Sequence, residues 1–117
     1  MAREAEVQND IMLALSQRGH RVFRSNAGKI RTDTGRFIQL FPRGFPDLLG
    51  WRKSDGKFFC IEVKNETGKL RDAQKRFASF AETQPILYGV ARSAEEAIEI
   101  VEGKSDESKT EKKATSK

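Results

Sequence analysis

The segment "GFPDLLGWRKSDGKFFCIEVKN", residues 44–65, contains two apolar runs joined by a turn. Residues 47–51 and 57–64 have the length and the apolar and aromatic content of strands, and Ser54-Asp55-Gly56 between them is typical of a tight turn. A β-hairpin is therefore predicted. The second run does not stay apolar, because "EVK" follows "FFCI" where further apolar residues would pack more easily. This strand end is predicted to carry a functional site.

The sequence on either side of this hairpin predicts an α/β domain. Apolar residues recur at helical spacing at Val7, Ile11 and Leu15, and again between Leu70 and Phe80. Ser93 is followed three residues later by a glutamate, which is the capping-box pattern of a helix start. The predicted elements are a helix at 4–18, a strand at 20–26, a hairpin over 29–41, strands at 47–51 and 57–64, a helix at 70–82, a strand at 85–91 and a helix from 93 to 103. The order α-β-β-β-β-β-α-β-α indicates helices that flank a mixed central sheet with an antiparallel middle.

The length of 117 residues fits a single domain, which we place at residues 1–103. Residues 104–117, "KSDESKTEKKATSK", have no large apolar side chain and are expected to form a disordered charged tail. No window has the roughly 20 apolar residues of a membrane span, and "MAREAEVQND" lacks the order of a signal peptide. The single cysteine, Cys60, lies in an apolar run, which excludes a disulfide framework and a cysteine metal cluster. We therefore expect an intracellular protein with no membrane partner.

The net charge of +5 is concentrated in one part of the chain. Residues 18–57 contain ten Lys and Arg against three Asp, a local balance of +7. A basic block of this kind favours a polyanionic partner, and nucleic acid is the commonest. The alternative on charge alone is an ordinary solvated surface rich in arginine and lysine.

Charged residues at the end of the 57–64 strand have a definite chemical use. Alternate residues of a strand share a face, so Glu62 and Lys64 lie on one side, and Asp47 opens the neighbouring strand of the hairpin. Two carboxylates suit Mg²⁺ or Mn²⁺, with the carbonyl of Val63 as a further oxygen ligand. Lys64 would orient or deprotonate the attacking water, which predicts phosphodiester hydrolysis. The alternative is a charged pair at a solvated strand end beside an acidic turn residue.

The pattern "FPD", followed fifteen residues later by "EVK" after an apolar run, resembles the PD-(D/E)xK nuclease superfamily. The longer stretch "GFPDLLG…FFCIEVKNETGKLRDAQKRF" is similar to the VRR-NUC family of replication and repair nucleases, in its short stand-alone form from phages and bacteria. The resemblance covers residues 4–100 and is strongest over 44–77. It implies a restriction-endonuclease-like core and a location in the bacterial or phage-infected cytoplasm.

The resemblance also implies roles for individual residues. Asp47 and Glu62 would be metal ligands and Lys64 the catalytic lysine. Gln74, in the helix after the lysine strand, would position water or phosphate; without the family it reads as a solvent-facing glutamine. Glu6 would match the acidic residue of the family's first helix, which supports metal-bound waters. Glu4 is an alternative register, and an acid in a first helical turn is stabilised by the helix dipole in any case.

Other polar residues are assigned from the basic block. The loop after the 20–26 strand offers backbone and side-chain donors suited to phosphate, although an ordinary loop is an equal alternative. The predicted nucleic-acid contacts are Arg24, Ser25, Asn26, Lys29, Arg31, Arg36 and Arg43. His20, the only histidine, is interpreted as a surface residue rather than a general base. Trp51 and Tyr88 are interpreted as core residues of strands.

The leading hypothesis is a DNA endonuclease that depends on Mg²⁺ or Mn²⁺. Kinship further implies structure-selective cutting of branched DNA such as the four-way Holliday junction, and a homodimer. The apolar residues of the 29–41 hairpin, Ile30, Phe37, Ile38 and Leu40, exceed what a peripheral hairpin needs and favour the homodimer. The alternatives are a nucleic-acid-binding module that does not cut, and a sequence-specific restriction enzyme, for which little chain remains to supply recognition elements.

Overall fold

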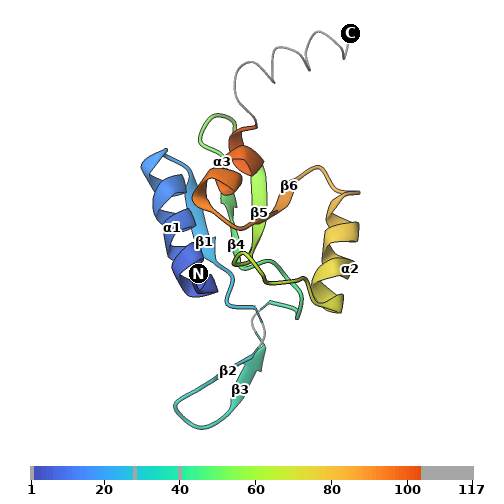
Figure 1. The fold of residues 1–117 in the computed structure, drawn as a ribbon. Coiled ribbons are helices and arrows are strands. Elements are labelled where there is room, and N and C mark those ends of the chain that lie inside the picture. Colours follow the sequence, from blue (N-terminus) through green and yellow to red (C-terminus); the bar gives the residue numbers. More distant parts are fainter. Residues whose placement is uncertain (1, 28, 40, 104–117) are drawn as a thin grey trace, which may run out of the picture.

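The computed structural model describes residues 2–27, 29–39 and 41–103, and the tail predicted at 104–117 lies outside the described residues (Figure 1). The elements follow the predicted order and differ from the predicted bounds by a few residues. They are α1 (Glu4–Gln17), β1 (Arg21–Arg24), β2 (Lys29–Arg31), β3 (Phe37–Gln39), β4 (Leu48–Trp51), β5 (Phe58–Val63), α2 (Asp72–Ala81), β6 (Leu87–Ala91) and α3 (Ala94–Glu102). None of the helices in these ranges has the length and apolar character that a bilayer crossing requires.

The central sheet has the strand order β1-β4-β5-β6. Strands β4 and β5 form the predicted antiparallel hairpin, whereas β6 returns through α2 and pairs with β5 in parallel. The sheet is therefore mixed with an antiparallel middle, as the sequence predicts. Strands β2 and β3 form a separate two-stranded hairpin that projects from the main body (Figure 1).

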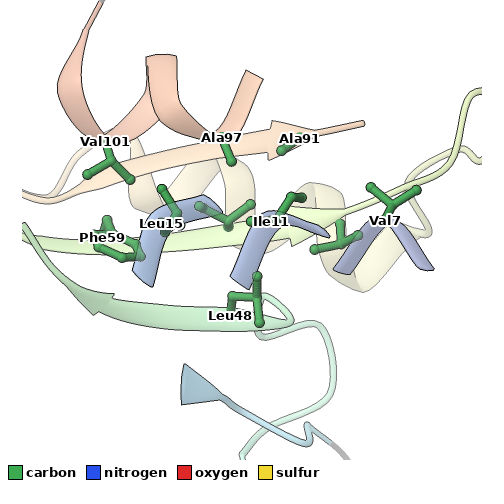
Figure 2. Packing of buried hydrophobic residues seen from close by; sticks show 10 residues of the cluster. Val7, Ile11, Leu15, Leu48, Phe59, Ala91, Ala97 and Val101 are labelled. Carbon is green, nitrogen blue, oxygen red and sulfur yellow. The ribbon is translucent and has the colours of Figure 1, made fainter. Parts of the chain in front are cut away.

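The hydrophobic core lies between one face of the sheet and helices α1 and α3. Val7, Ile11 and Leu15, the helical stripe of α1, are buried against the apolar face of β5 (Figure 2). That face contains Phe59, Ile61 and Val63, the odd-numbered residues of the strand. Helix α2 packs on the opposite face of the sheet, where Phe77 contacts Tyr88 of β6 with ring centroids 5.8 Å apart. The two faces of β5 therefore have different roles: one builds the core, and the other carries Glu62.

Three predictions about single residues are corrected by the structure. Trp51 is 48% exposed rather than part of the core, because α2 covers only the β6 side of its sheet face. His20 is buried rather than on the surface, since Glu102 and Lys53 satisfy both of its ring nitrogens. At the start of α3 the Ser93 hydroxyl accepts the Glu96 N–H as predicted, but the Glu96 carboxylate accepts the N–H of Arg92 rather than that of Ser93.

Candidate active site

Asp47 and Glu62 meet at one end of the sheet, as the strand pattern predicts. The backbone N–H of Val63 donates a 2.8 Å hydrogen bond to Asp47 Oδ2, which fixes the aspartate beside the end of β5. Val63 therefore contributes its N–H to the site, and a metal contact through its carbonyl stays a prediction. Lys64 follows directly, with its Nζ 3.8 Å from Glu62 Oε2. One corner of the molecule thus holds two carboxylates and one ammonium group.

Glu62 is the most strongly perturbed acid of this cluster. Its side chain is almost fully buried, at 2% exposure. Burial, followed by the negative charge of Asp47, raises the pKa of Glu62 to about 9, and the charge of Lys64 offsets only part of this effect. Strongly perturbed carboxylates inside a cleft are typical of functional sites.

Gln74 of α2 belongs to the same cluster. Its Nε2 donates a 3.0 Å hydrogen bond to Glu62 Oε2, and its Oε1 accepts a 2.8 Å hydrogen bond from the backbone N–H of Arg71. The glutamine therefore faces the site rather than solvent. It connects the amino-terminal end of α2 to the buried carboxylate of Glu62.

The structure places Glu4, and not Glu6, at the site. Glu4 Oε2 lies 4.0 Å from Lys64 Nζ, whereas the Glu6 carboxylate accepts the backbone N–H of Arg3 at 2.9 Å and helps to cap α1. Glu4 lies three residues before Val7 and therefore on the helical stripe that faces the sheet. Glu6 lies off that stripe. The spacing from Val7 is the sequence signal that favours Glu4, the alternative register, over Glu6.

Ser25 has a different role from the phosphate contact expected for it. Its hydroxyl is buried and donates a 2.7 Å hydrogen bond to the carbonyl oxygen of Pro46, and its N–H donates to the carbonyl oxygen of Asp47 at 2.9 Å. The side chain thus has no exposure with which to meet a ligand. It holds the segment that carries Asp47.

The other predicted nucleic-acid residues are distributed along the surface. Arg24, Asn26, Arg31, Arg36 and Arg43 are all exposed. Arg24 donates to Asn9 Oδ1 at 2.7 Å, and the guanidinium of Arg31 lies over the ring of Phe37. Lys29 begins β2. Of the five side chains that the structure describes in this group, only Arg43 lines the cleft that contains Asp47.

This cleft separates the 43–47 loop from the start of α2 and has a volume of about 710 Å³. Its lining residues are Ala27, Arg43, Gly44, Phe45, Asp47, Arg71, Asp72, Ala73, Gln74 and Arg76. Phe45 fixes one wall of the cleft through two ring contacts. Its ring stacks on that of Phe41 with centroids 4.6 Å apart, and it meets the ring of Phe77 in α2 edge-on with centroids 5.2 Å apart. The wall formed by α2 brings in Arg71 and Arg76, two cations that the sequence assignments omit because they lie outside the basic block.

The ligand atoms present here fit a hard divalent cation. Within residues 2–27, 29–39 and 41–103 no three His, Cys, Asp or Glu side chains are grouped as a self-sufficient metal site. However, Mg²⁺ usually takes only one or two carboxylates and completes its shell with water and substrate phosphate. A cation held by Asp47 and Glu62 would also offset the negative charge of Asp47, which after burial is the next cause of the raised pKa of Glu62.

Comparison with known proteins agrees with this architecture. The family model for the VRR-NUC domain matches residues 5–95. A solved structure described as a VRR-NUC domain superposes with a TM-score of 0.60, covering 86% of this chain and 95% of that chain at 22% sequence identity, which shows a shared fold. Comparison with curated proteins finds no match. Because the family model spans most of its length, the chain belongs to the VRR-NUC family of the restriction-endonuclease-like nuclease superfamily.

Proposed function

We propose that this nuclease domain is a DNA endonuclease that depends on Mg²⁺ or Mn²⁺. The observation that carries the proposal is the convergence of Asp47 and Glu62 at one corner of the molecule, beside Lys64 and Gln74. Asp47 and Gln74 of this cluster line the cleft. A binding module that does not cut has no physical need for two neighbouring carboxylates, one of them almost fully buried. Such a pair raises the energy of the folded protein unless a cation or a proton compensates it.

Each residue of the cluster has a separate task in phosphodiester hydrolysis. Asp47 and Glu62 would hold the cation, and the backbone N–H of Val63 keeps Asp47 in position for it. When bound, Mg²⁺ or Mn²⁺ supplies Lewis acidity toward the scissile phosphate and lowers the pKa of a coordinated water. The Lys64 ammonium group orients the attacking water and offsets the charge that develops on the phosphate oxygens.

Two further residues position this machinery. Gln74 donates to Glu62 and thereby fixes the carboxylate beside the start of α2. Glu4 pairs with Lys64 from the side of α1 and restricts the position of its ammonium group. Both act through a neighbour rather than on the substrate.

We propose branched DNA, including the four-way junction, as the substrate and a homodimer as the active form, in the cytoplasm of a bacterium or phage-infected cell. Membership of a nuclease family supports a DNA substrate. A homodimer suits the four-way junction, because a junction presents two equivalent strands to a two-fold pair of sites. Exposed apolar side chains support the dimer. Phe23, Trp51 and Phe58 are 37–48% exposed on the sheet, and Phe37 and Ile38 are exposed on the projecting hairpin.

The test incubates the full chain with supercoiled plasmid, linear duplex, flap and four-way junction, each with Mg²⁺, Mn²⁺ or EDTA. We expect cleavage with either metal, none in EDTA, and the fastest turnover on the junction. Asp47→Asn, which conserves volume, is the matched control and should bind DNA without cutting it. A wild-type protein that binds all four DNAs but cuts none with either metal would establish a binding module instead.

A further inference from the structure

Arg71 and Arg76 are exposed cations on the wall of the cleft that α2 provides. They line the same cavity as Asp47 and Gln74, whereas Lys75, exposed on the same helix between them, is not among the lining residues. The proposed chemistry uses neither arginine. Their position raises the question of what they bind.

Arg71 is tied to the catalytic cluster through its backbone. Its N–H donates to Gln74 Oε1 at 2.8 Å, and Gln74 Nε2 donates to Glu62 Oε2 at 3.0 Å. A single glutamine therefore links the main chain of this arginine to the buried carboxylate. The backbone of Arg71 is therefore fixed relative to Glu62, and the side chain that would bind a ligand extends from this fixed position.

The opposite wall of the cleft is fixed as well. Gly44 has a φ of +92°, and a Cβ at this position would lie 2.7 Å from the carbonyl oxygen of Ala73 in α2. Only glycine allows the 43–47 loop to approach the helix so closely. Arg43 precedes this contact and lines the cleft across from α2. The backbones of the two walls that carry the arginines are thus fixed relative to one another.

The cleft has the charge of a backbone-binding groove. Its lining contains Arg43, Arg71 and Arg76 against Asp47 and Asp72. Asp47 is assigned to the metal, so three guanidinium groups face one remaining carboxylate. Guanidinium groups bind phosphate in a planar bidentate geometry that ammonium groups cannot reproduce.

We propose that Arg71 and Arg76 bind backbone phosphates of the strand being cut, beside the scissile phosphate, and so set which bond reaches Asp47 and Glu62. The inference rests on the proposed nuclease function. It assigns the substrate strand a path along the cleft that α2 and the 43–47 loop line together, in addition to the predicted basic block at residues 18–57. Arg71 and Arg76 contact the sugar-phosphate backbone and carry no base specificity.

The experiment compares wild type with Arg71→Gln, Arg76→Gln and the double variant, and uses Lys75→Gln as the matched control. Binding of a four-way junction and of a single strand is measured in EDTA over a range of salt concentrations, and cleavage is measured with Mg²⁺. Each arginine substitution should lower the slope of log affinity against log salt by about 0.7–0.9, the contribution of one phosphate contact. Lys75→Gln should leave the slope and the cleavage rate unchanged.

Two further measurements separate this role from a structural one. Arg71→Lys and Arg76→Lys should retain most of the salt slope, because the charge remains, yet shift the positions of the cut bonds on an end-labelled strand. Thermal unfolding shows whether each variant folds. Equal slope changes for Lys75→Gln and for the arginine variants, or unchanged slopes and cut positions in the folded double variant, would overturn the proposal. Absence of cleavage by wild type under all conditions would instead overturn the nuclease function, while the binding arm still tests the phosphate contacts.

Discussion

Glu62 shows how a residue proposed as a metal ligand can be unfavourable for folding. Its side chain is 2% exposed and lies beside a second carboxylate. Its pKa of about 9 means that the metal-free protein keeps this acid protonated at neutral pH. The proposed metal site requires the ionised form. Cation binding and proton release at Glu62 are therefore expected to be coupled.

The first prediction follows from this conflict. Glu62→Gln should keep or raise the melting temperature in EDTA, because the amide imitates the protonated acid and can still accept from Gln74 Nε2. The same change should abolish Mg²⁺ binding and cleavage, since one of the two proposed ligand carboxylates is lost. Calorimetric titration with Mg²⁺, thermal unfolding in EDTA and a plasmid-nicking assay provide the three readouts. Nicking at the wild-type rate would exclude Glu62 as a ligand.

The second prediction compares Glu4 with Glu6. Glu4→Gln should lower the cleavage rate on the order of tenfold or more, because the ammonium group of Lys64 loses one of its two carboxylate partners. Glu6→Gln is the matched control and should change only stability, by a few tenths of a kcal/mol at the start of α1. Single-turnover cleavage with saturating Mg²⁺ measures the difference. A larger loss for Glu6→Gln would return the first-helix role to that residue.

Among the secondary-structure elements, the end of the sheet opposite the candidate site is held by a partly buried polar cluster. The backbone N–H of Lys53, in the β4–β5 turn, donates to His20 Nδ1 at 2.9 Å, so His20 Nε2 donates its proton to Glu102 Oε2 at 2.7 Å. Arg18 donates twice to the same carboxylate, at 2.6 Å each. The cluster joins the ends of α1 and α3 to the turn of the central hairpin. Glu102 is its common acceptor.

The third prediction concerns the pH dependence of this junction. Hydrogen bonds from Arg18, and then from His20, lower the pKa of Glu102 to about 2. A carboxylate with a lowered pKa stabilises the fold above its unfolded-state pKa, and this stability is lost as the pH falls toward the folded-state value. Glu102→Gln should therefore reduce the free energy of unfolding at neutral pH on the order of 1 kcal/mol, and the difference from wild type should disappear between about pH 5 and about pH 2.

Urea unfolding at a series of pH values measures this effect. Glu99→Gln, an exposed position on the same helix, is the matched control and should follow wild type at every pH. A Glu102→Gln difference that persists undiminished in acid would show that packing, rather than the ion pair, holds the junction.

At the scale of the whole molecule, the sheet face that carries Glu62 is only half covered. Helix α2 packs over β6, while Phe23, Trp51 and Phe58 remain exposed on β1, β4 and β5 of that face. Trp51 pairs with Phe58 across the strands, and its ring lies 5.9 Å from that of Phe23. A continuous aromatic surface of this kind is typical of a protein–protein interface. It adds to Phe37 and Ile38, which are exposed on the projecting hairpin.

The fourth prediction places the proposed homodimer on this surface. Wild type at micromolar concentration should sediment as a species of twice the 13.2 kDa chain mass. Trp51→Glu should shift it to the monomer, because a charge at the centre of an apolar interface is left desolvated. The matched control is Leu13→Glu, which places the same charge on an exposed apolar residue of α1 outside this face. A wild type that sediments only as the 13.2 kDa chain would contradict the dimer.

The sequence by itself determined the order of elements and the meeting of Asp47, Glu62 and Lys64 at one end of the sheet. Apolar spacing in α1 and alternation in β5 are local properties, and the turn at 54–56 forces β4 and β5 to pair. Pairing of adjacent strands then brings Asp47 to the end of β5. These features depend on residues close together in the chain, and local sequence patterns therefore predict them.

Only the tertiary structure decided which polar residues are buried and which faces are covered. The burial of His20 depends on Glu102, 82 positions away, and that of Ser25 on Pro46, 21 positions away. The exposure of Trp51 depends on where α2 lies across the sheet, and the cleft position of Arg71 depends on how Gln74 meets Glu62. The free energy of a buried polar group is set by partners that the fold brings to it, and no local pattern in the sequence specifies those partners.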